Sequence, residues 1–401
     1  MIPRRRIAFE WADLGDALRA LTVSPSLAAE QVRAFEGAFA AAVGVPQAIA
    51  TASGRDALGL ILDGLGFVPG DELVIPAYTL GELVPLIRAR GIVPVPADID
   101  PATFNVTADS VAARIGARTR GVFVVHLLGA PCDIGAICAV AERRGLAVIE
   151  DCAHALGAQC EGRAVGSFGR AALFSLEATK AVATFGGGVL TTSDDVLAAH
   201  IRARVADRPR REWPPVRKML LKWVEEAVIR SPAYALLAPL MFSERAAGAF
   251  EKLYRGAHDK VRGNPAAFSA FQARLGLRKL ARLAARQQVL NTRWEALAAQ
   301  LPGRFERQQR NHHGSAAFYN FVARFDGDIG ALRQAALRGG LDLGVGSEVM
   351  DDTAAMLGFG DCPGAACAFR QAVLLPLYPG LSERRFRRVV ATLGRLAQEV
   401  K

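Results

Sequence analysis

The chain has 401 residues, of which 51% are hydrophobic, and its formal net charge is +10. This length and composition argue against a disordered chain and predict two domains, or one large domain with an appendage. No apolar run reaches 18 residues, so we expect no membrane span. The six cysteines form no CxxC pair and no Cys/His set with zinc-finger spacing. That pattern favours free thiols in a reducing cytoplasm and no metal site.

Two helical patterns open the chain, and short apolar runs then alternate with amphipathic stretches. This alternation predicts a mostly parallel sheet with helices on both faces. The opening helices are expected at about 12–20 and 26–43, the strands at 73–76, 121–125, 147–149, 171–174 and 188–191, and the intervening helices at 54–65, 79–90, 107–116 and 133–144. In such sheets ligands bind beyond the carboxyl ends of the strands, so the polar residues there are the candidate site.

The pattern changes after His200. Residues 202–262 hold five prolines and 14 Lys or Arg against 7 Asp or Glu, with basic helical pieces between the prolines. Beyond them we expect a long helix from Phe268 towards Gln300, β-like runs around 317–324, and helices near 328–338 and 382–399. We therefore predict a large α/β domain (1–262) with a basic helical insertion at about 202–262, and a smaller C-terminal α+β domain (263–401).

The first candidate position is a helix start that can hold phosphate. Ser53 is suited to cap the helix, Gly54 lets a ligand approach the backbone, and Arg55 adds positive charge. Taken alone, an ordinary capped helix is the better interpretation. Tyr78 follows the next strand, where its ring can lie against a planar ligand or simply sit at the rim. His126, after the third strand, can be a core histidine.

The next two strands are followed by groups of more specific chemistry. Asp151 ends the run that begins at Ala147, where a carboxylate can pair with a protonated ring nitrogen or merely close a turn. His154 comes three residues later and can face the same ring. Ser175 follows the 171–174 strand, and Lys180 lies in an apolar stretch before Gly186–Gly188. A buried lysine with a lowered pKa can attack an aldehyde, whereas a snorkelling lysine would have no such role.

Together these residues occur in an order that resembles the DegT/DnrJ/EryC1/StrS aminotransferases, a group of fold type I pyridoxal-phosphate (PLP) enzymes. The matching segments are Ser53–Leu58, Gly70–Pro76, Asp98–Asp100, Thr103–Asn105, Val125–Gly129, Val148–His154, Gly166–Gly169, Phe174–Ser175, Lys180 and Gly186–Gly188. The match is dense from about residue 30 to 200 and looser at Gln272–Leu275 and Leu374–Pro379. The resemblance implies a mostly parallel sheet sandwiched by helices and a homodimer with shared active sites.

The resemblance also implies roles for individual residues. Lys180 would hold PLP as a Schiff base and move protons, Asp151 would bind the ring nitrogen, and His154 would lie beside the ring. Ser53, Gly54, Arg55 and Ser175 would bind the phosphate, and Tyr78 would lie over the ring. Many relatives carry an Asn-x-Arg-Met-Ser motif that reaches the partner subunit's cofactor. Here Ala267 stands at the arginine position, and Asn264 fits only with a one-residue shift.

The expected reaction is transfer of an amino group, with glutamate as donor, to a keto sugar linked to a nucleotide or a lipid. The alternatives are dehydration or elimination with the same cofactor, a lipid-like ketone as substrate, and a non-enzymatic regulator. Lys180 argues against the sugar dehydratase branch, where histidine replaces this lysine. The Asp151 and Lys180 pair argues against the regulator.

The basic segment mixes cations with tryptophan and leucine, as interfacial helices do. One hypothesis is that residues 210–255 rest on an anionic membrane, which would make a cytoplasmic enzyme peripheral at the inner face of that membrane. A helical lid or a dimer-interface insertion is the favoured alternative. Nucleic acid is not an expected partner, because no binding motif accompanies the charge.

Overall fold

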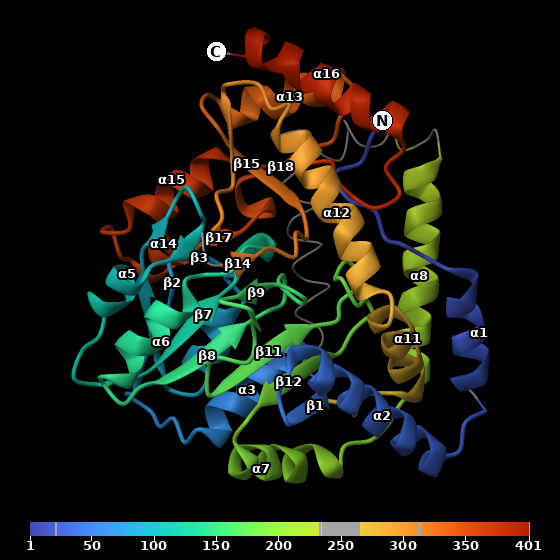
Figure 1. Cartoon of the computed structure of the whole chain (residues 1–401), viewed down its shortest axis with the longest axis vertical. Coiled ribbons are helices and arrows are strands. Elements are labelled where there is room, and N and C mark those ends of the chain that lie inside the picture. Colours follow the sequence, from blue (N-terminus) through green and yellow to red (C-terminus); the bar gives the residue numbers. More distant parts are fainter. Residues whose placement is uncertain (21, 232–233, 235–264, 312–313, 401) are drawn as a thin grey trace.

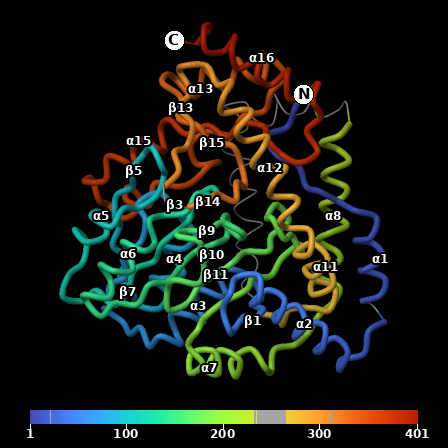
Figure 2. The backbone as a smooth tube through the Cα atoms, viewed as in Figure 1, coloured from blue at the N-terminus to red at the C-terminus, as the bar shows by residue number. Residues whose placement is uncertain are grey.

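The computed structural model describes residues 1–20, 22–231, 234, 265–311 and 314–400. A seven-stranded sheet with helices around it forms the larger part, and a four-stranded sheet forms the smaller part, which carries the C-terminal helix (Figure 1). The backbone trace in Figure 2 shows the N-terminal residues running beside the smaller part before the chain enters the larger one.

The larger sheet has the strand order β1-β12-β11-β8-β7-β2-β4. Its strands are β1 (Gln47–Thr51), β12 (Gly188–Thr192), β11 (Ala171–Ser175), β8 (Ala147–Asp151), β7 (Thr119–Val125), β2 (Glu72–Pro76) and β4 (Val93–Ala97). β12 runs antiparallel to both of its neighbours, whereas the other adjacent pairs are parallel. This mostly parallel sheet confirms the predicted α/β fold class.

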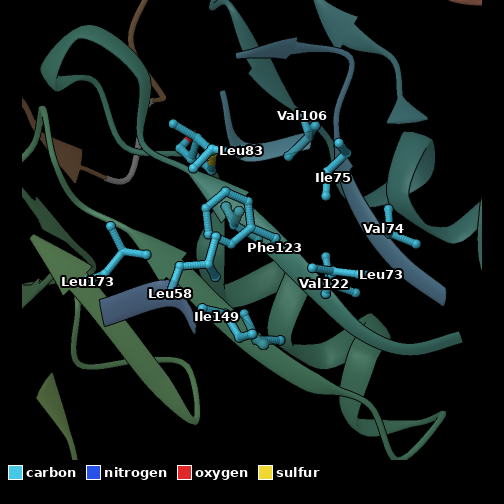
Figure 3. Close-up of a cluster of buried hydrophobic side chains, with 14 of the residues drawn as sticks. Leu58, Leu73, Val74, Ile75, Leu83, Val106, Val122, Phe123, Ile149 and Leu173 are labelled. Atoms are coloured by element: carbon cyan, nitrogen blue, oxygen red, sulfur yellow. The ribbon is translucent and has the colours of Figure 1, made fainter. Parts of the chain in front are cut away.

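Alternate residues of the strands pack into two separate cores, as the period of a strand requires. Leu173 of β11 belongs to a core with residues of α3 (Gly54–Gly64), α6 (Ile134–Glu142) and α7 (Asp195–Ala206). Figure 3 shows part of this core, with Phe123 lying among Leu58, Ile149 and Leu173. Phe174, the next residue of β11, faces the second core, which includes residues of α2 (Pro25–Val43) and α11 (Ala270–Leu280).

Local sequence signals explain where the helices begin and end. Ser24 caps α2 by accepting from Leu27 N, Pro25 occupies its first turn, and Gly44 ends it in the left-handed conformation. Ser53 caps α3 in the same way, through Asp56 N. The remaining helices of this part are α1 (Trp11–Ala20), α4 (Leu83–Arg88), α5 (Ala108–Ala112), α8 (Trp213–Arg230) and α12 (Leu283–Ala298).

The smaller part is built on the antiparallel order β13-β15-β18-β16. Its strands are β13 (Phe305–Arg307), β15 (Phe321–Phe325), β18 (Ala372–Leu375) and β16 (Gly344–Val345), and its helices are α13 (Ile329–Arg338), α14 (Thr353–Leu357), α15 (Pro363–Gln371) and α16 (Glu383–Glu399). Minor pairings add β3 (Tyr78–Thr79) with β17 (Asp351–Asp352), β5 (Ile99–Asp100) with β6 (Asn105–Val106), and β10 (Arg163–Ala164) with β9 (Gln159–Cys160) and β14 (Gly314–Ser315).

The first ten residues form a strap between the two parts. Ile2 is buried in the core of the smaller part, donates its N–H to Gly340 O at 2.8 Å, and accepts from Asp342 N at 3.0 Å. Arg4 pairs with Asp342 through two side-chain contacts of 2.8 and 2.9 Å. Ile7 then packs beside α8 and α11 in a core of the larger part. The strap therefore fixes both ends of a segment whose middle contains Arg5 and Arg6.

Several expected elements differ in extent. The single helix predicted from Phe268 to Gln300 is two helices, α11 and α12, because the chain leaves helical geometry at Arg282. The helix predicted at 79–90 is the shorter α4, since residues 78–79 pair with β17 instead. These differences come from tertiary pairing with distant segments, which periodicity does not report.

The predicted domain boundary at 262/263 lies outside the described residues. Helix α11, which follows it, packs against α2 and α1 of the larger part, while α12 leads towards the smaller sheet (Figure 1). The division into residues 1–262 and 263–401 stays a prediction.

Truncating Phe123 tests the core of the larger sheet. Its ring is 1% exposed, so Phe123→Ala should lower the free energy of unfolding by about 3–5 kcal/mol. Val224→Ala, at a side chain that is 64% exposed, should change it by less than about 0.5 kcal/mol. Urea denaturation followed by circular dichroism measures both. Equal effects of the two substitutions would contradict the packing described.

Candidate functional site

The ends of two central strands place the first groups of the site. β8 and β11 are parallel, with Asp151 opposite Leu173. Asp151 is the last residue of β8, and Ser175, two residues beyond Leu173, is the last residue of β11. The chain then enters a loop, residues 176–187, before returning as β12. Lys180 lies in this loop, so the acid, the serine and the lysine share one edge of the sheet.

The loop that carries Lys180 is closed at its base. Leu176 N donates to Gly187 O at 3.1 Å, and Lys180 N donates to Glu177 O at 2.9 Å. Phe185 has a φ of 59°, which is unusual for a residue with a side chain. Its ring stacks on Phe9 of the strap, with centroids 5.5 Å apart. These contacts hold the strained backbone in place.

Cations from three helices clamp the same loop. Lys279 of α11 donates to Ala183 O at 2.7 Å, and Arg286 of α12 donates to Ala181 O at 3.1 Å. Lys218 of α8 makes contacts of 2.7 and 2.8 Å with the two carboxylate oxygens of Glu177. The basic helix α8 is therefore attached to the loop three residues before Lys180.

Aromatic residues surround the amine of Lys180. Its Nζ lies 4.7 Å from the centroid of the Tyr319 ring, and that ring stacks on His154 with centroids 4.7 Å apart. The Tyr319 hydroxyl donates to Thr179 Oγ1 at 2.6 Å. Lys180, His154, Ser175 and Tyr319 all line one cavity.

Asp151 is a buried carboxylate that lacks a full set of partners. Its Oδ1 accepts from Ala153 N at 2.8 Å, and it forms no ion pair within the part of the chain that is described. Burial raises the pKa of Asp151, and the nearby charges of Lys180 and His126 oppose that rise. Such a group would be stabilised by a cationic hydrogen-bond donor.

A buried hydrogen-bonded pair, His126 and Glu150, adjoins the end of β8 that carries Asp151. His126 Nε2 lies 3.0 Å from Glu150 Oε2, and both side chains are fully buried. Glu150 also accepts from the backbone N–H groups of Gly166, Phe168 and Gly169. Hydrogen bonds with His126 and these backbone groups keep the pKa of Glu150 low despite its burial. The backbone N–H of His126 donates to Asp151 O at 3.0 Å, so this core histidine fixes the end of β8.

His154 is held as a neutral ring. Burial, helped by the charge of Lys180, lowers its pKa well below the usual value. Its Nδ1 accepts a hydrogen bond from Leu128 N at 3.4 Å, which requires an unprotonated nitrogen. The ring can therefore stack on a flat ligand or partner without adding charge.

The predicted phosphate residues meet at the start of α3. A Cβ atom placed on Gly54 would make ordinary contact with Ser175 Cβ at 3.5 Å, so the helix start lies directly against the end of β11. Gly188 lies so close behind that a Cβ there would come within 2.6 Å of Gly54 N. The free backbone N–H groups at such a helix start are a favourable place for a phosphate. Ser53, Gly54 and Ser175 are thus brought together.

Other predicted residues are not brought to this place. Arg55 forms an ion pair with Glu82. Tyr78 is fully buried, and its ring packs beside Phe104 rather than lining the cavity of Lys180. The expectation that Tyr78 covers the cofactor ring stays a prediction. Asn264 lies outside the described residues.

The structure adds residues that the sequence did not single out. Tyr319 and Arg286 line the cavity although they lie more than 100 residues after Lys180. Tyr319 belongs to a run that only looked β-like, and Arg286 belongs to the stretch predicted as one long helix. Thr179 also lines the cavity, and its position next to Lys180 in the chain could have indicated it.

Comparison with known proteins shows which family the sequence matches. A model of the DegT/DnrJ/EryC1/StrS aminotransferase family matches residues 17–394. GDP-perosamine synthase from Caulobacter vibrioides is 43% identical over 185 residues, which are 45% of this chain and 50% of that protein. UDP-N-acetyl-3-dehydro-alpha-D-glucosamine 3-aminotransferase from Acidithiobacillus ferrooxidans is 40% identical over 173 residues, 43% and 47% of the two chains. The chain thus spans about half the length of these curated relatives.

The fold has solved counterparts over its whole length. The aminotransferase TlmJ from Streptoalloteichus hindustanus superimposes with a TM-score of 0.78, covers 99% of both chains and is 25% identical. The predicted fold type and the predicted family are therefore both confirmed.

The lowered pKa of His154 predicts a dependence of stability on pH. The unfolded chain takes up a proton on this residue near pH 6.5, whereas the folded, cofactor-free protein does not, so stability falls as the pH drops through about 6.5. His154→Gln should reduce that loss, while His200→Gln, at an exposed residue, should not. Urea denaturation between about pH 8 and 5 measures this. Parallel curves for His154→Gln and the wild type would contradict it.

Proposed function

The chain belongs to the DegT/DnrJ/EryC1/StrS aminotransferase family, and we propose that it transfers an amino group from glutamate to a keto sugar carried on a nucleotide or a lipid. The observation that carries this proposal is the meeting of Asp151, Lys180 and Ser175 at one edge of the sheet. The names of the two relatives, a GDP-sugar synthase and a UDP-sugar aminotransferase, support a keto sugar as acceptor.

The residues fit PLP, the cofactor of this family. Asp151 is a buried carboxylate without an ion-pair partner among the described residues, and a protonated ring nitrogen would supply the missing cation. The free backbone N–H groups at the start of α3, where Gly54 lies against Ser175, would hold the phosphate. When bound, PLP supplies an electron sink, because its protonated ring stabilises negative charge on the substrate carbon.

The chain's own residues then have separate tasks. Lys180 Nζ holds the cofactor and carries the proton between donor and acceptor carbons, since it is the amine at the centre of the cavity. Asp151 keeps the ring nitrogen protonated. The neutral ring of His154, stacked on Tyr319, adds no competing charge beside the reacting centre.

Dehydration or elimination with the same cofactor is the second candidate reaction. Retention of Lys180 favours amino transfer, because the lysine can return a proton to the acceptor carbon. L-glutamate and L-serine separate the two reactions. Amino transfer converts L-glutamate to 2-oxoglutarate and aminates the cofactor, whereas elimination removes water from L-serine, and hydrolysis of the product then gives pyruvate and ammonia.

Replacing Lys180 tests the assignment of the cofactor. Borohydride should fix PLP covalently to the wild-type peptide that contains Lys180, and Lys180→Ala should abolish that mass increase because no amine remains there. Lys222→Ala on the outer part of α8 is the control and should label like the wild type. A Lys180→Ala protein still labelled on the same peptide would refute the assignment.

The family resemblance also implies a homodimer, which we propose for the cofactor-loaded protein. Light scattering coupled to size-exclusion chromatography tests it directly. A monomer at micromolar concentration would contradict it.

We propose further that the outer face of α8 contacts an anionic membrane. Leu221, Val224 and Val228 are exposed on the side of α8 opposite buried Val216 and Met219. Trp11 of α1 is 82% exposed, and its ring contacts Trp223 of α8. Such an apolar helix face normally has a covering partner.

The charges around this face favour an anionic partner. Arg211 and Arg217 are exposed and form no ion pair with the described residues. Lys218, on the other side of α8, ties the helix to the loop of Lys180, so a docked membrane would lie near the active site. A lipid-linked acceptor would benefit from this arrangement. In the described part of the chain, no helix is long and apolar enough to span a bilayer.

Vesicle flotation tests this surface. The intact protein should float with vesicles of phosphatidylglycerol and phosphatidylcholine but not with phosphatidylcholine alone, because both apolar contact and charge contribute. Leu221→Ser/Val224→Ser should lose most of the floated fraction, and Val68→Ser, at an equally exposed site elsewhere, should not. Absence of flotation of the wild type would contradict the proposed membrane contact. Conversion of a dimer to monomers by the double variant would instead assign this face of α8 to contact with a second copy of the chain.

A further inference from the structure

The cavity beside Lys180 is strongly cationic. Among the described residues that line it are Lys180, Arg5, Arg6 and Arg286, and none of the described lining residues is Asp or Glu. Arg6 is neutralised by Glu226, with Nε 2.6 Å from Oε1. Arg5 is exposed to solvent, where water satisfies it. Arg286 is the partly buried cation whose charge still needs an explanation.

The neighbouring arginines show how unusual Arg286 is. Arg278 and Arg282 stand eight and four residues earlier, and both form ion pairs with Glu10. Arg286 forms no ion pair with any described residue. Burial lowers the pKa of Arg286, which means that keeping its guanidinium charged at this place costs free energy. A charged group kept in a cavity without a protein partner commonly serves a ligand.

The hydrogen-bond donors of Arg286 are largely unused. A guanidinium has five N–H groups in a fork that matches a carboxylate or a phosphate. Its Nη1 donates to Ala181 O at 3.1 Å, whereas its Nε is buried and has no partner in the part of the chain that the structure describes. One bond to the Lys180 loop therefore positions the side chain and leaves other donors for an anion.

The position of Arg286 indicates which anion of the proposed reaction it would bind. The cofactor phosphate is expected beside Gly54 and Ser175, at the start of α3. The phosphates of a nucleotide sugar are separated from the reacting carbonyl by part of the sugar ring. The carboxylate of an amino donor, by contrast, is attached to the same carbon as the reacting amine. Since Arg286 contacts the residue next to Lys180, the donor carboxylate fits best.

We propose that Arg286 binds the carboxylate of the amino donor in the cavity beside Lys180. This inference rests on the proposed amino transfer and adds a subsite to it. Arg286 forms a charge-assisted, bidentate contact with the carboxylate, and its bond to Ala181 O sets the distance from that contact to the reacting amine.

The test uses the PLP-loaded protein and its Arg286→Met and Arg286→Lys variants. L-glutamate is titrated while cofactor absorbance reports its amination, and succinate is titrated as a non-reacting carboxylate. Loss of a charged hydrogen bond predicts that Arg286→Met weakens the apparent affinity for both by about 10- to 100-fold, with a partial recovery in Arg286→Lys. Arg282→Met, which breaks only the pair with Glu10, should behave like the wild type.

A control separates recognition from a merely structural role. Cofactor loading, measured by absorbance, should persist in Arg286→Met, because Lys180, Asp151 and Ser175 are still present. Loss of cofactor loading, or unchanged affinity for glutamate and succinate, would overturn the inference. If the cofactor of the wild type reacted with no amino acid, the proposed function would be refuted. The affinity for succinate would in that case still test whether Arg286 binds a carboxylate.

Discussion

Asp151 and Leu173 face each other across the parallel strands β8 and β11, and this register decides where the chemical groups of the site lie. A shift by one residue would turn Asp151 to the opposite face of the sheet. Strand β11 ends two residues after Leu173, and the Lys180 loop begins with the next residue. The hydrogen-bonded pair His126 and Glu150 then stops β8 from fraying at the end that carries the acid.

The sequence was informative wherever a site residue follows a strand closely. Asp151, Ser175 and Lys180 could be predicted because short apolar runs mark the strands and parallel strands expose their carboxyl ends together. The same rule placed Tyr78 after a strand, but its side chain is fully buried beside Phe104, so its role at the cofactor ring stays a prediction. Chain position gives the edge of the sheet, whereas the direction of a side chain depends on partners hundreds of residues away.

Tyr319 and Arg286 are cavity residues that their positions in the chain did not predict. Each reaches the cavity through the packing of the C-terminal part against the Lys180 loop, and no local pattern reports such packing. The count of charged residues in a segment likewise does not show which of them form ion pairs. Residues 202–262 looked like a free basic surface, yet Arg208 pairs with Asp56 and Lys218 pairs with Glu177. Part of the positive charge of this segment is thus paired with carboxylates of α3 and of the Lys180 loop, and Arg217 of α8 is exposed.

The strap formed by the first ten residues has a practical consequence. Ile2 is hydrogen-bonded to the backbone at Gly340 and Asp342, and Arg5 and Arg6, only a few residues later, line the cavity. A purification tag or fusion partner joined ahead of Met1 would begin one residue from this pairing and pull on the cavity wall. The far end of α16 is anchored as well, because Val400 is buried in the core of the smaller part and its carbonyl oxygen accepts from Arg304. Recombinant protein for kinetic work is therefore better studied after any tag has been removed.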